Sequence, residues 1–416
     1  MKNKKILIIG HVWPEPKSSA AGSRMMQLIE CFILKEFQIT FATTSTKSSN
    51  SVNLQELGIL EEKIKLNDSG FNDFVKNLDP AIVMFDRFMT EEQFGWRITE
   101  SCPDAIKILN TEDLHCLRKG RELALLDELP FDITYLYNEV AKREIASILR
   151  CDISLIISEF EMQLLESDFK IDPSLLHYLP FMLGEITTKR IEKLPSYSDR
   201  QHFVTIGNFL HKPNLDSIKL LKTKIWPLIH TELPDVQLHI FGAYASEKVH
   251  QFHDPNNGFY IKGFAKNVDS VMQSAKVCLA PLQFGAGLKG KIIDAMKNGT
   301  PCAMTTIASE GLFGNLESNG FIENNYSLLA IKAVELYSDE QKWNQKQSNG
   351  FRVINDRFIK DSFQQQFMIH LEALAKELPS RRLNNFTGAM LNHHHLQSTK
   401  YMSRWIEEKQ KTKLNN

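Results

Sequence analysis

The stretch LQFGAGLKGKIIDAMKNGTP, from Leu282 to Pro301, is the part of the chain that decides the fold. An apolar, strand-like run leads into it, and three glycines within six residues are followed by lysines and a helical pattern. Asn298-Gly299-Thr300-Pro301 ends this helix, because glycine is favoured just past a helix and proline cannot continue one. The stretch therefore predicts a strand, a glycine-rich loop and a helix that begins near Lys289, with the N-terminus of the helix at the loop.

This loop has the chemistry of an anion site. Unpaired amides at a helix N-terminus carry partial positive charge, and Gly285 and Gly287 let the backbone approach an oxygen closely. Lys289 and Lys291 add two cations beside the loop. Asp294, about one turn into the helix, could accept hydrogen bonds from a ribose diol or could pair with a lysine on the same helix face. We therefore expect these five residues to bind a phosphate-bearing ligand.

The same loop, Gly285 to Gly290, also fits the dinucleotide pattern G-x-G-x-x-G. That pattern normally follows the first strand of its domain, whereas this loop comes after several strands. A nicotinamide pyrophosphate is usually held by backbone amides alone. A diphosphate that leaves with growing negative charge benefits from added cations, so the lysine pair favours a reaction of that kind over a dehydrogenase.

Outward from this loop, short apolar runs alternate with helical patterns, which indicates α/β units with parallel sheets. A first series of predicted strands covers Lys4–Gly10, Gln38–Thr44, Ala81–Asp86, Ala105–Asn110, Asp152–Ser158 and Leu175–Pro180. A second series covers His202–Gly207, Val236–Gly242, Phe259–Gly263, Lys276–Leu282 and Pro301–Thr306. Both series open with a strand that ends in Ile-Gly. We expect two doubly wound domains in tandem, with a ligand between them at the carboxyl ends of the strands.

Composition shifts divide the chain further. We expect a first domain over residues 1–183, a polar linker over 184–201, a second domain over 202–350 and C-terminal helices over 351–378 that cross back to the first domain. A polar tail with a terminal helix is expected over 379–416. Its run of three histidines, His393 to His395, could bind a metal ion, but a disordered polar stretch is the favoured interpretation.

Composition excludes several classes of protein. The chain has 416 residues, 43% of them hydrophobic and 24% charged, and a net charge of −1, which gives no bulk attraction to nucleic acid or acidic membranes. The six cysteines form no C-x-x-C pair, and free thiols fit a reducing compartment. No apolar run is long enough for a membrane span or a signal peptide. We therefore expect a cytoplasmic protein, and contact with the inner face of a membrane stays compatible with this.

The segment PLQFGAGLKGKIIDAMKNGTPCAMTTIASEGL, Pro281 to Leu312, resembles the donor-binding segment of retaining GT-B glycosyltransferases of the family 4 type. IGNFLHKPNLDSI, Ile206 to Ile218, resembles the loop and helix that open the donor domain of these enzymes. IIGHVWPEPKSSAAGSRMMQL, Ile8 to Leu28, resembles the start of their acceptor domain. The resemblance extends over residues 1 to about 375.

The resemblance implies two Rossmann-like domains that face a central cleft, with a nucleotide-diphosphate sugar bound by the C-terminal one and an acceptor by the N-terminal one. It implies no cofactor and no obligatory metal, since the nucleotide sugar is a substrate. The donor helix of the family typically carries two glutamates eight positions apart. Here Asp294 occupies the second position, and Ala286 stands eight residues before it. The N-terminal loop has only Gly22 where two glycines are common.

Polar residues crowd the carboxyl end of the strand Ala105–Asn110. Glu112, Asp113, His115 and Arg118 lie there within nine residues, from Asn110 to Arg118, and in similar enzymes a histidine near this point faces the sugar. We therefore expect Glu112, Asp113 and His115 to be catalytic, with a structural histidine as the alternative.

Four further residues extend the expected site. Glu310 follows the strand Pro301–Thr306 and could accept a hydrogen bond from the donor, or it could be an acid that stabilises a helix start. Lys212 resembles a basic residue that contacts the donor phosphates. Gly22 and Arg24, at the start of the first helix, are expected to contact the acceptor, with a surface arginine as the alternative for Arg24.

The leading hypothesis is an enzyme that moves a sugar from a nucleotide-diphosphate sugar to an acceptor hydroxyl with retention. The acceptor would be a glycan, a lipid-linked saccharide or a protein, in polysaccharide, glycolipid or glycoprotein glycan synthesis. A sugar-nucleotide epimerase on the same fold and a non-catalytic subunit that binds a sugar nucleotide are the alternatives.

Overall fold

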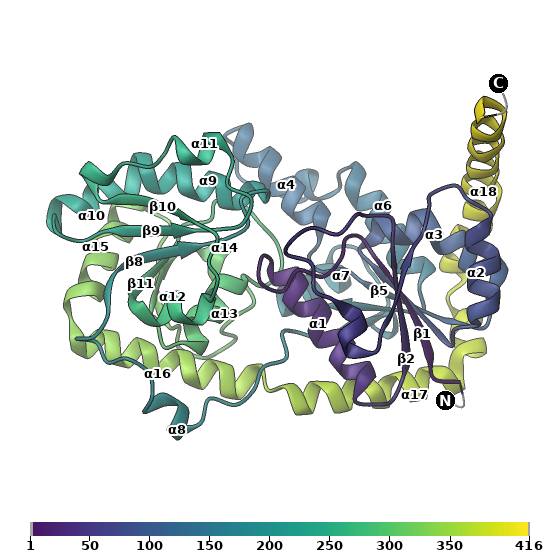
Figure 1. Ribbon diagram of the computed structural model, residues 1–416, viewed down its shortest axis with the longest axis horizontal. Helices are drawn as coiled ribbons and strands as arrows, with labels where there is room; N and C mark the ends of the chain where they lie inside the picture. The colour runs from purple at the N-terminus through teal and green to yellow at the C-terminus, as the bar shows by residue number, and fades with distance from the viewer. Residues whose placement is uncertain (1–2, 415–416) are drawn as a thin grey trace.

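The computed structural model describes residues 3–414 and contains two α/β domains that lie side by side (Figure 1). The first domain has a seven-stranded parallel sheet of order β3-β2-β1-β4-β5-β6-β7. Its strands are β1 Lys5–Gly10, β2 Gln38–Thr43, β3 Leu60–Lys63, β4 Ile82–Asp86, β5 Ile106–Asn110, β6 Ile153–Ile156 and β7 Leu176–Tyr178.

The second domain repeats this topology in a six-stranded parallel sheet of order β10-β9-β8-β11-β12-β13. Its strands are β8 Gln201–Ile206, β9 Leu238–Phe241, β10 Phe259–Gly263, β11 Ala275–Ala280, β12 Cys302–Met304 and β13 Gly320–Ile322. In each sheet the first strand lies next to the fourth, so each sheet has one switch point where ligands bind. The predicted pair of doubly wound domains is therefore confirmed.

Every strand predicted from the sequence is present, and two edge strands were missed. β3 has the sequence LEEK and is largely exposed, while β13 is only three residues long. Edge strands pair on one side only and need no continuous apolar run, so the hydrophobic pattern gave no signal for them.

Helices cover both faces of each sheet. Those before the second domain are α1 Ala20–Ile33, α2 Gly70–Leu78, α3 Phe88–Ser101, α4 His115–Leu126, α5 Ile133–Leu136, α6 Glu139–Arg150, α7 Glu159–Ser167 and α8 Thr188–Ile191. Those after it begins are α9 Lys212–Leu220, α10 Trp226–Glu232, α11 Glu247–His250, α12 Val268–Ser274, α13 Gly290–Lys297, α14 Thr306–Ser309, α15 Tyr326–Ser338, α16 Glu340–Arg357, α17 Lys360–Asn384 and α18 Phe386–Leu414.

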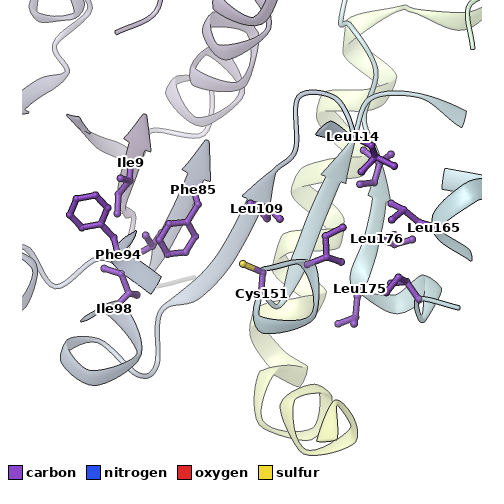
Figure 2. Close-up of a cluster of buried hydrophobic side chains, with 14 of the residues drawn as sticks. Ile9, Phe85, Phe94, Ile98, Leu109, Leu114, Cys151, Leu165, Leu175 and Leu176 are labelled. Carbon is purple, nitrogen blue, oxygen red and sulfur yellow. The ribbon is translucent and has the colours of Figure 1, made fainter. Parts of the chain in front are cut away.

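The apolar core of the first domain explains why its strands read as continuous hydrophobic runs. Figure 2 shows Ile9, Phe85 and Leu109 of neighbouring strands packed with Phe94 and Ile98 of α3. Strands buried on both faces have no polar alternation, and the side chains of β1, β4 and β5 are buried almost throughout.

The opposite face of the first sheet is covered by α1 and by α17 from the far end of the chain (Figure 1). Phe367, Leu371 and Leu374 of α17 are at most 1% exposed within this core. The chain crosses between the domains twice, and the two crossings are joined where Leu183 donates to the carbonyl of Phe358 at 2.7 Å and accepts from the amide of Lys360 at 2.9 Å.

The last helix, α18, packs on α3 and α6 at the outer edge of the first domain (Figure 1). His395 is buried there and its Nε2 lies 3.0 Å from the carbonyl oxygen of Glu92. The expectation of a disordered stretch around His393–His395 is therefore wrong: these residues are helical, because His395 and Ser403 face the first domain instead of solvent.

All six cysteines are buried and unpaired. Among the helices of residues 3–414, none combines the length and the apolar character that a membrane crossing requires.

Candidate active site

A cavity of about 490 Å³ lies between the two domains, at the carboxyl ends of strands from both sheets. Gly285, Gly287, Lys289, Lys291 and Asp294 line it from the second domain. Glu112, Asp113 and His115 line it from the first. The structure thus brings together eight of the residues singled out in the sequence, from segments far apart in the chain.

The glycine-rich loop has the local structure predicted for it. Lys289 is the N-cap residue of α13, and no side chain within residues 3–414 caps this helix start. Gly287 has a φ of 64°, a left-handed conformation that glycine adopts without strain. Amide groups at such a helix start attract an anion, so the loop can hold a phosphate group against the cavity.

The two lysines of the loop are held by neutral oxygen acceptors. Lys289 Nζ donates to the carbonyl of Gly287 at 2.7 Å, and Lys291 Nζ donates to Asn214 Oδ1 at 3.0 Å. Burial lowers the pKa of each lysine to about 8. A buried cation without a carboxylate in contact is costly, and an anionic ligand in the cavity would offset that cost.

Asp294 faces the cavity from α13. Burial raises the pKa of its carboxyl group to about 6, against the opposing effect of Lys297. Lys297 Nζ lies 3.7 Å from Asp294 Oδ1, and both residues line the cavity. The lysine pairing considered in the sequence is therefore present, and it leaves the carboxylate at the cavity wall.

The opposite wall is formed by the segment after β5, which carries the side chains of Glu112, Asp113 and His115. Asp113 pairs with Arg118, and its Oδ1 lies 3.4 Å from His115 Nε2. Burial disfavours ionisation of Asp113, but Arg118 and His115 lower its pKa well below the usual range. Burial lowers the pKa of His115 to about 3, so its imidazole is neutral at neutral pH and can both donate and accept a hydrogen bond.

Glu112 is held in a strained backbone conformation beside these groups. Its φ is 64°, which is unusual for a residue with a side chain. Oε1 accepts from Asn110 Nδ2 at 2.8 Å. Burial, followed by the nearby Asp86, raises the pKa of the Glu112 carboxyl group well above its usual range.

Glu310 and Lys212 lie at the domain interface and do not line the cavity. Arg121 of α4 donates to both carboxylate oxygens of Glu310, at 3.0 and 2.6 Å, and to the carbonyl of Gly285 at 2.8 Å. Lys212 Nζ pairs with Glu122 of the first domain at 2.7 Å. The partners of both residues belong to the first domain, so the sequence around each residue could not predict these pairs.

Gly22 and Arg24 also lie outside the cavity wall. Arg24 is fully buried and donates to the carbonyl of Pro180 at 2.9 Å, so neither an acceptor contact nor a surface position describes it. A side chain at position 22 would collide with the backbone of Glu15, which explains the glycine. Their neighbour Ser23 does line the cavity.

One basic residue of the cavity wall, Arg87, was missed in the sequence, whereas Arg118, expected near His115, lines the wall and pairs with Asp113. Arg87 follows β4 directly and has a φ of 73°. No partner for its buried Nε is found within residues 3–414. Its place at the carboxyl end of a strand, next in the sheet to the strand that precedes Glu112, is the signal that could have identified it.

Comparisons of the sequence with known proteins match one family and one relative. The family model described as "Glycosyl transferases group 1" matches residues 200–339. An uncharacterized 44.6 kDa protein in the cps region of Klebsiella pneumoniae is 26% identical over 160 residues. That match spans 37% of this chain and 41% of the relative, which is less than half the length of either.

Solved structures resemble almost the whole chain. Sucrose-phosphate synthase from Thermosynechococcus elongatus superposes with a TM-score of 0.67 at 15% identity, covering 89% of this chain and 99% of that one. Anabaena Alr3699/HepE gives 0.64 at 14% identity, covering 89% and 100%. Mutant TarM of S. aureus gives 0.55 at 16% identity, covering 72% and 57%. At such identities these likenesses show the shared two-domain fold. The chain therefore has the two-domain GT-B fold of these structures, and residues 200–339 in its second domain match the glycosyl transferases group 1 family model.

Proposed function

We propose that the protein transfers a sugar from a nucleotide-diphosphate sugar to an acceptor hydroxyl with retention of configuration. The observation that carries this proposal is the composition of the cavity. One wall has a glycine loop with two cations and a carboxylate on a helix, and the other has a partly buried histidine between charged side chains. A diphosphate fits the first wall, and a polar, uncharged sugar ring fits the second.

In this proposal the diphosphate lies at the start of α13. As the bond between the anomeric carbon and the phosphate oxygen breaks, negative charge grows on the departing phosphate. Lys289, Lys291 and the amides of α13 are positioned to stabilise that charge, in a site where little water lowers its interaction energy. Asp294 accepts hydrogen bonds from the ribose. The protein's own cations neutralise the leaving group, so the proposal calls for no resident metal or cofactor.

The sugar ring lies against the loop after β5. The neutral His115 gives a hydrogen bond to a sugar hydroxyl, and Asp113 and Arg118 fix the orientation of its imidazole. The acceptor oxygen forms the new bond on the face from which the phosphate departs, and its proton passes to that phosphate. Bond making and breaking on one face would account for retention.

The identity of the donor and the acceptor is a finer part of the proposal. One solved structure of Anabaena Alr3699/HepE contains UDP-glucose, and one of S. aureus TarM contains alpha-GlcNAc-glycerol and UDP. WaaG is described as a glycosyltransferase involved in lipopolysaccharide biosynthesis. We therefore propose a UDP-hexose donor and a glycan or lipid-linked acceptor. The six unpaired cysteines fit a reducing, cytoplasmic location.

Release of nucleoside diphosphate tests the proposal. The full-length protein is incubated with UDP, GDP, ADP and dTDP sugars, with and without glycan and lipid-linked acceptors, and the anomeric configuration of the product is assigned by NMR. One donor should give acceptor-dependent release and a retained product. A rearranged sugar nucleotide without release would support an epimerase. Tight binding of a donor without turnover would support the non-catalytic subunit, which the alanine at position 286 favours.

A further inference from the structure

The start of α4, where His115 lies, is held by carboxyl groups from elsewhere in the first domain. Leu114 is the N-cap residue, and its side chain cannot cap the helix. Glu144 of α6 accepts from the amides of His115 and Cys116, at 3.0 and 2.9 Å. Glu161 of α7 accepts from the amide of Leu114 at 3.0 Å. The amides at a helix start need such acceptors when they are buried.

Glu161 makes a second contact that Glu144 lacks. The same oxygen, Oε1, accepts from the amide of Gly287 in the second domain at 2.8 Å. Glu161 is fully buried. One oxygen atom therefore joins the loop that carries His115 to the loop expected to carry the diphosphate.

The glycine loop and the first domain fit closely around this bond. Arg121 donates to the carbonyl of Gly285 at 2.8 Å, also across the interface. The Cα of Gly287 has no room for a side chain, because a methyl group there would lie 2.9 Å from Asp113 Cβ. Because these contacts cross the interface, they are made only while the two domains lie in the arrangement of this structure, which we call closed.

We propose that Glu161 is a positioning residue that links closure of the domains to assembly of the active site, by holding the amides of Leu114 and Gly287 on one oxygen. This inference rests on the proposed function for its effect on catalysis, whereas the bridge itself does not depend on which reaction is catalysed.

The bridge does not need a charged carboxylate. Burial raises the pKa of Glu161 to about 8, with the nearby Asp113 acting in the same direction and Lys289 against it. A protonated carboxyl group still presents a carbonyl oxygen to both amides, and Oε2 has no partner within residues 3–414. A glutamine can therefore replace it, because its amide has one carbonyl oxygen and similar size.

The test compares four full-length variants with the wild type. Glu161→Met removes the acceptor and keeps the length of the side chain, whereas Glu161→Gln keeps the acceptor. Glu144→Met is the matched control, since it removes an acceptor from the same helix start and leaves the second domain untouched. Glu161→Asp shortens the side chain and replaces Glu161→Met if that variant does not fold.

Three kinds of measurement are made on each variant. The first is hydrogen exchange of the peptide that contains Gly287, and the second is the radius of gyration by X-ray scattering. The third is enzyme kinetics, which gives turnover, together with the affinity for UDP. Glu161→Met should speed exchange of the Gly287 peptide by about tenfold or more, since a buried amide loses its acceptor. It should also raise the radius of gyration. Turnover should fall by about tenfold or more while UDP affinity changes by less than about threefold, because the diphosphate site lies within the second domain. Glu161→Gln should restore all three.

Glu144→Met should lower turnover without changing exchange at Gly287 or the radius of gyration. Unchanged exchange and scattering in Glu161→Met, or the same changes in Glu144→Met, would overturn the bridge. If no sugar donor is turned over, the proposed function fails, and exchange and scattering still decide the bridge. If Glu161→Met changes exchange and scattering but keeps normal turnover in an active enzyme, the positioning role is overturned.

Discussion

Adding a single methyl group at Gly287 should separate catalysis from donor binding. The methyl carbon of Gly287→Ala would lie 2.9 Å from Asp113 Cβ and 3.4 Å from the carbonyl oxygen of Glu112. Carbon atoms pack at about 3.5–4.0 Å, so the first contact is too short by more than half an ångström. Both neighbours belong to the first domain, and the collision therefore acts on the closed arrangement alone.

The size of the effect follows from these contacts. Overpacking of this kind costs about 1–3 kcal/mol, which corresponds to a loss of roughly fivefold to more than a hundredfold in the population of the closed state. The left-handed backbone at Gly287, with a φ of 64°, adds about 1–2 kcal/mol of strain for alanine. That strain is carried by the second domain whether the domains are open or closed.

Gly285→Ala is the matched control within the same loop. Gly285 also has an unfavourable φ for alanine, 153°, but its methyl group would meet nothing closer than Lys289 Cε at 3.7 Å. Turnover, UDP affinity by calorimetry and the radius of gyration are measured for both variants. Relative to its loss of UDP affinity, Gly287→Ala should lose more turnover than Gly285→Ala does. Its radius of gyration should also be larger. Equal losses in the two variants would refute a closed arrangement as the active one.

Three further changes test single walls of the cavity. Lys289→Ala with Lys291→Ala should weaken UDP binding by about tenfold or more, or about 1.4 kcal/mol. Because both pKa values are lowered to about 8, wild-type affinity should fall as the pH rises from about 7 to about 9 while the lysines lose charge, and this pH dependence should vanish in the double variant. Asp294→Asn should weaken UDP binding. Replacing UDP by its 2′,3′-dideoxyribose analogue should then reduce the affinity of the variant less than it reduces the affinity of the wild type. Equal reductions would show that Asp294 does not contact the ribose. Since the pKa of Asp294 is raised to about 6, the wild-type contact should weaken as the pH falls through that value. His115→Ala should leave UDP affinity nearly intact and lower turnover by about tenfold or more; near-normal turnover with a lower melting temperature would make His115 structural.

The sequence predicted those parts of the site that are built locally. The glycine loop, the start of α13 and the loop after β5 each lie within one strand–loop–helix unit, where glycines, apolar runs and polar clusters act on near neighbours. The residues singled out between Gly285 and Asp294 could therefore be assigned to one wall from the sequence alone.

Residues whose environment is set by distant segments were not predictable in this way. Arg24 was expected to contact the acceptor or to lie on the surface, yet it is fully buried and donates to Asn110 of β5 and to the carbonyl of Pro180. Glu161 and Glu144 occur in ordinary helical patterns, and only the tertiary structure brings them to the start of α4. A carboxylate on a helix is usually solvated, so periodicity alone gave no reason to select either one.

The double crossing of the chain has a consequence for the order in which the protein folds during synthesis. α17 completes the core of the first domain, with Phe367 and Leu371 fully or almost fully buried beneath its sheet. These residues emerge from the ribosome only after the whole second domain, which spans β8 to β13. Until then, the first domain exposes an apolar face that its finished fold covers, and domains usually fold as they are made, N-terminal first. Here the second domain can complete its sheet while the first still waits for its last helix, so the nascent chain passes through a stage in which its older half is the more vulnerable to aggregation.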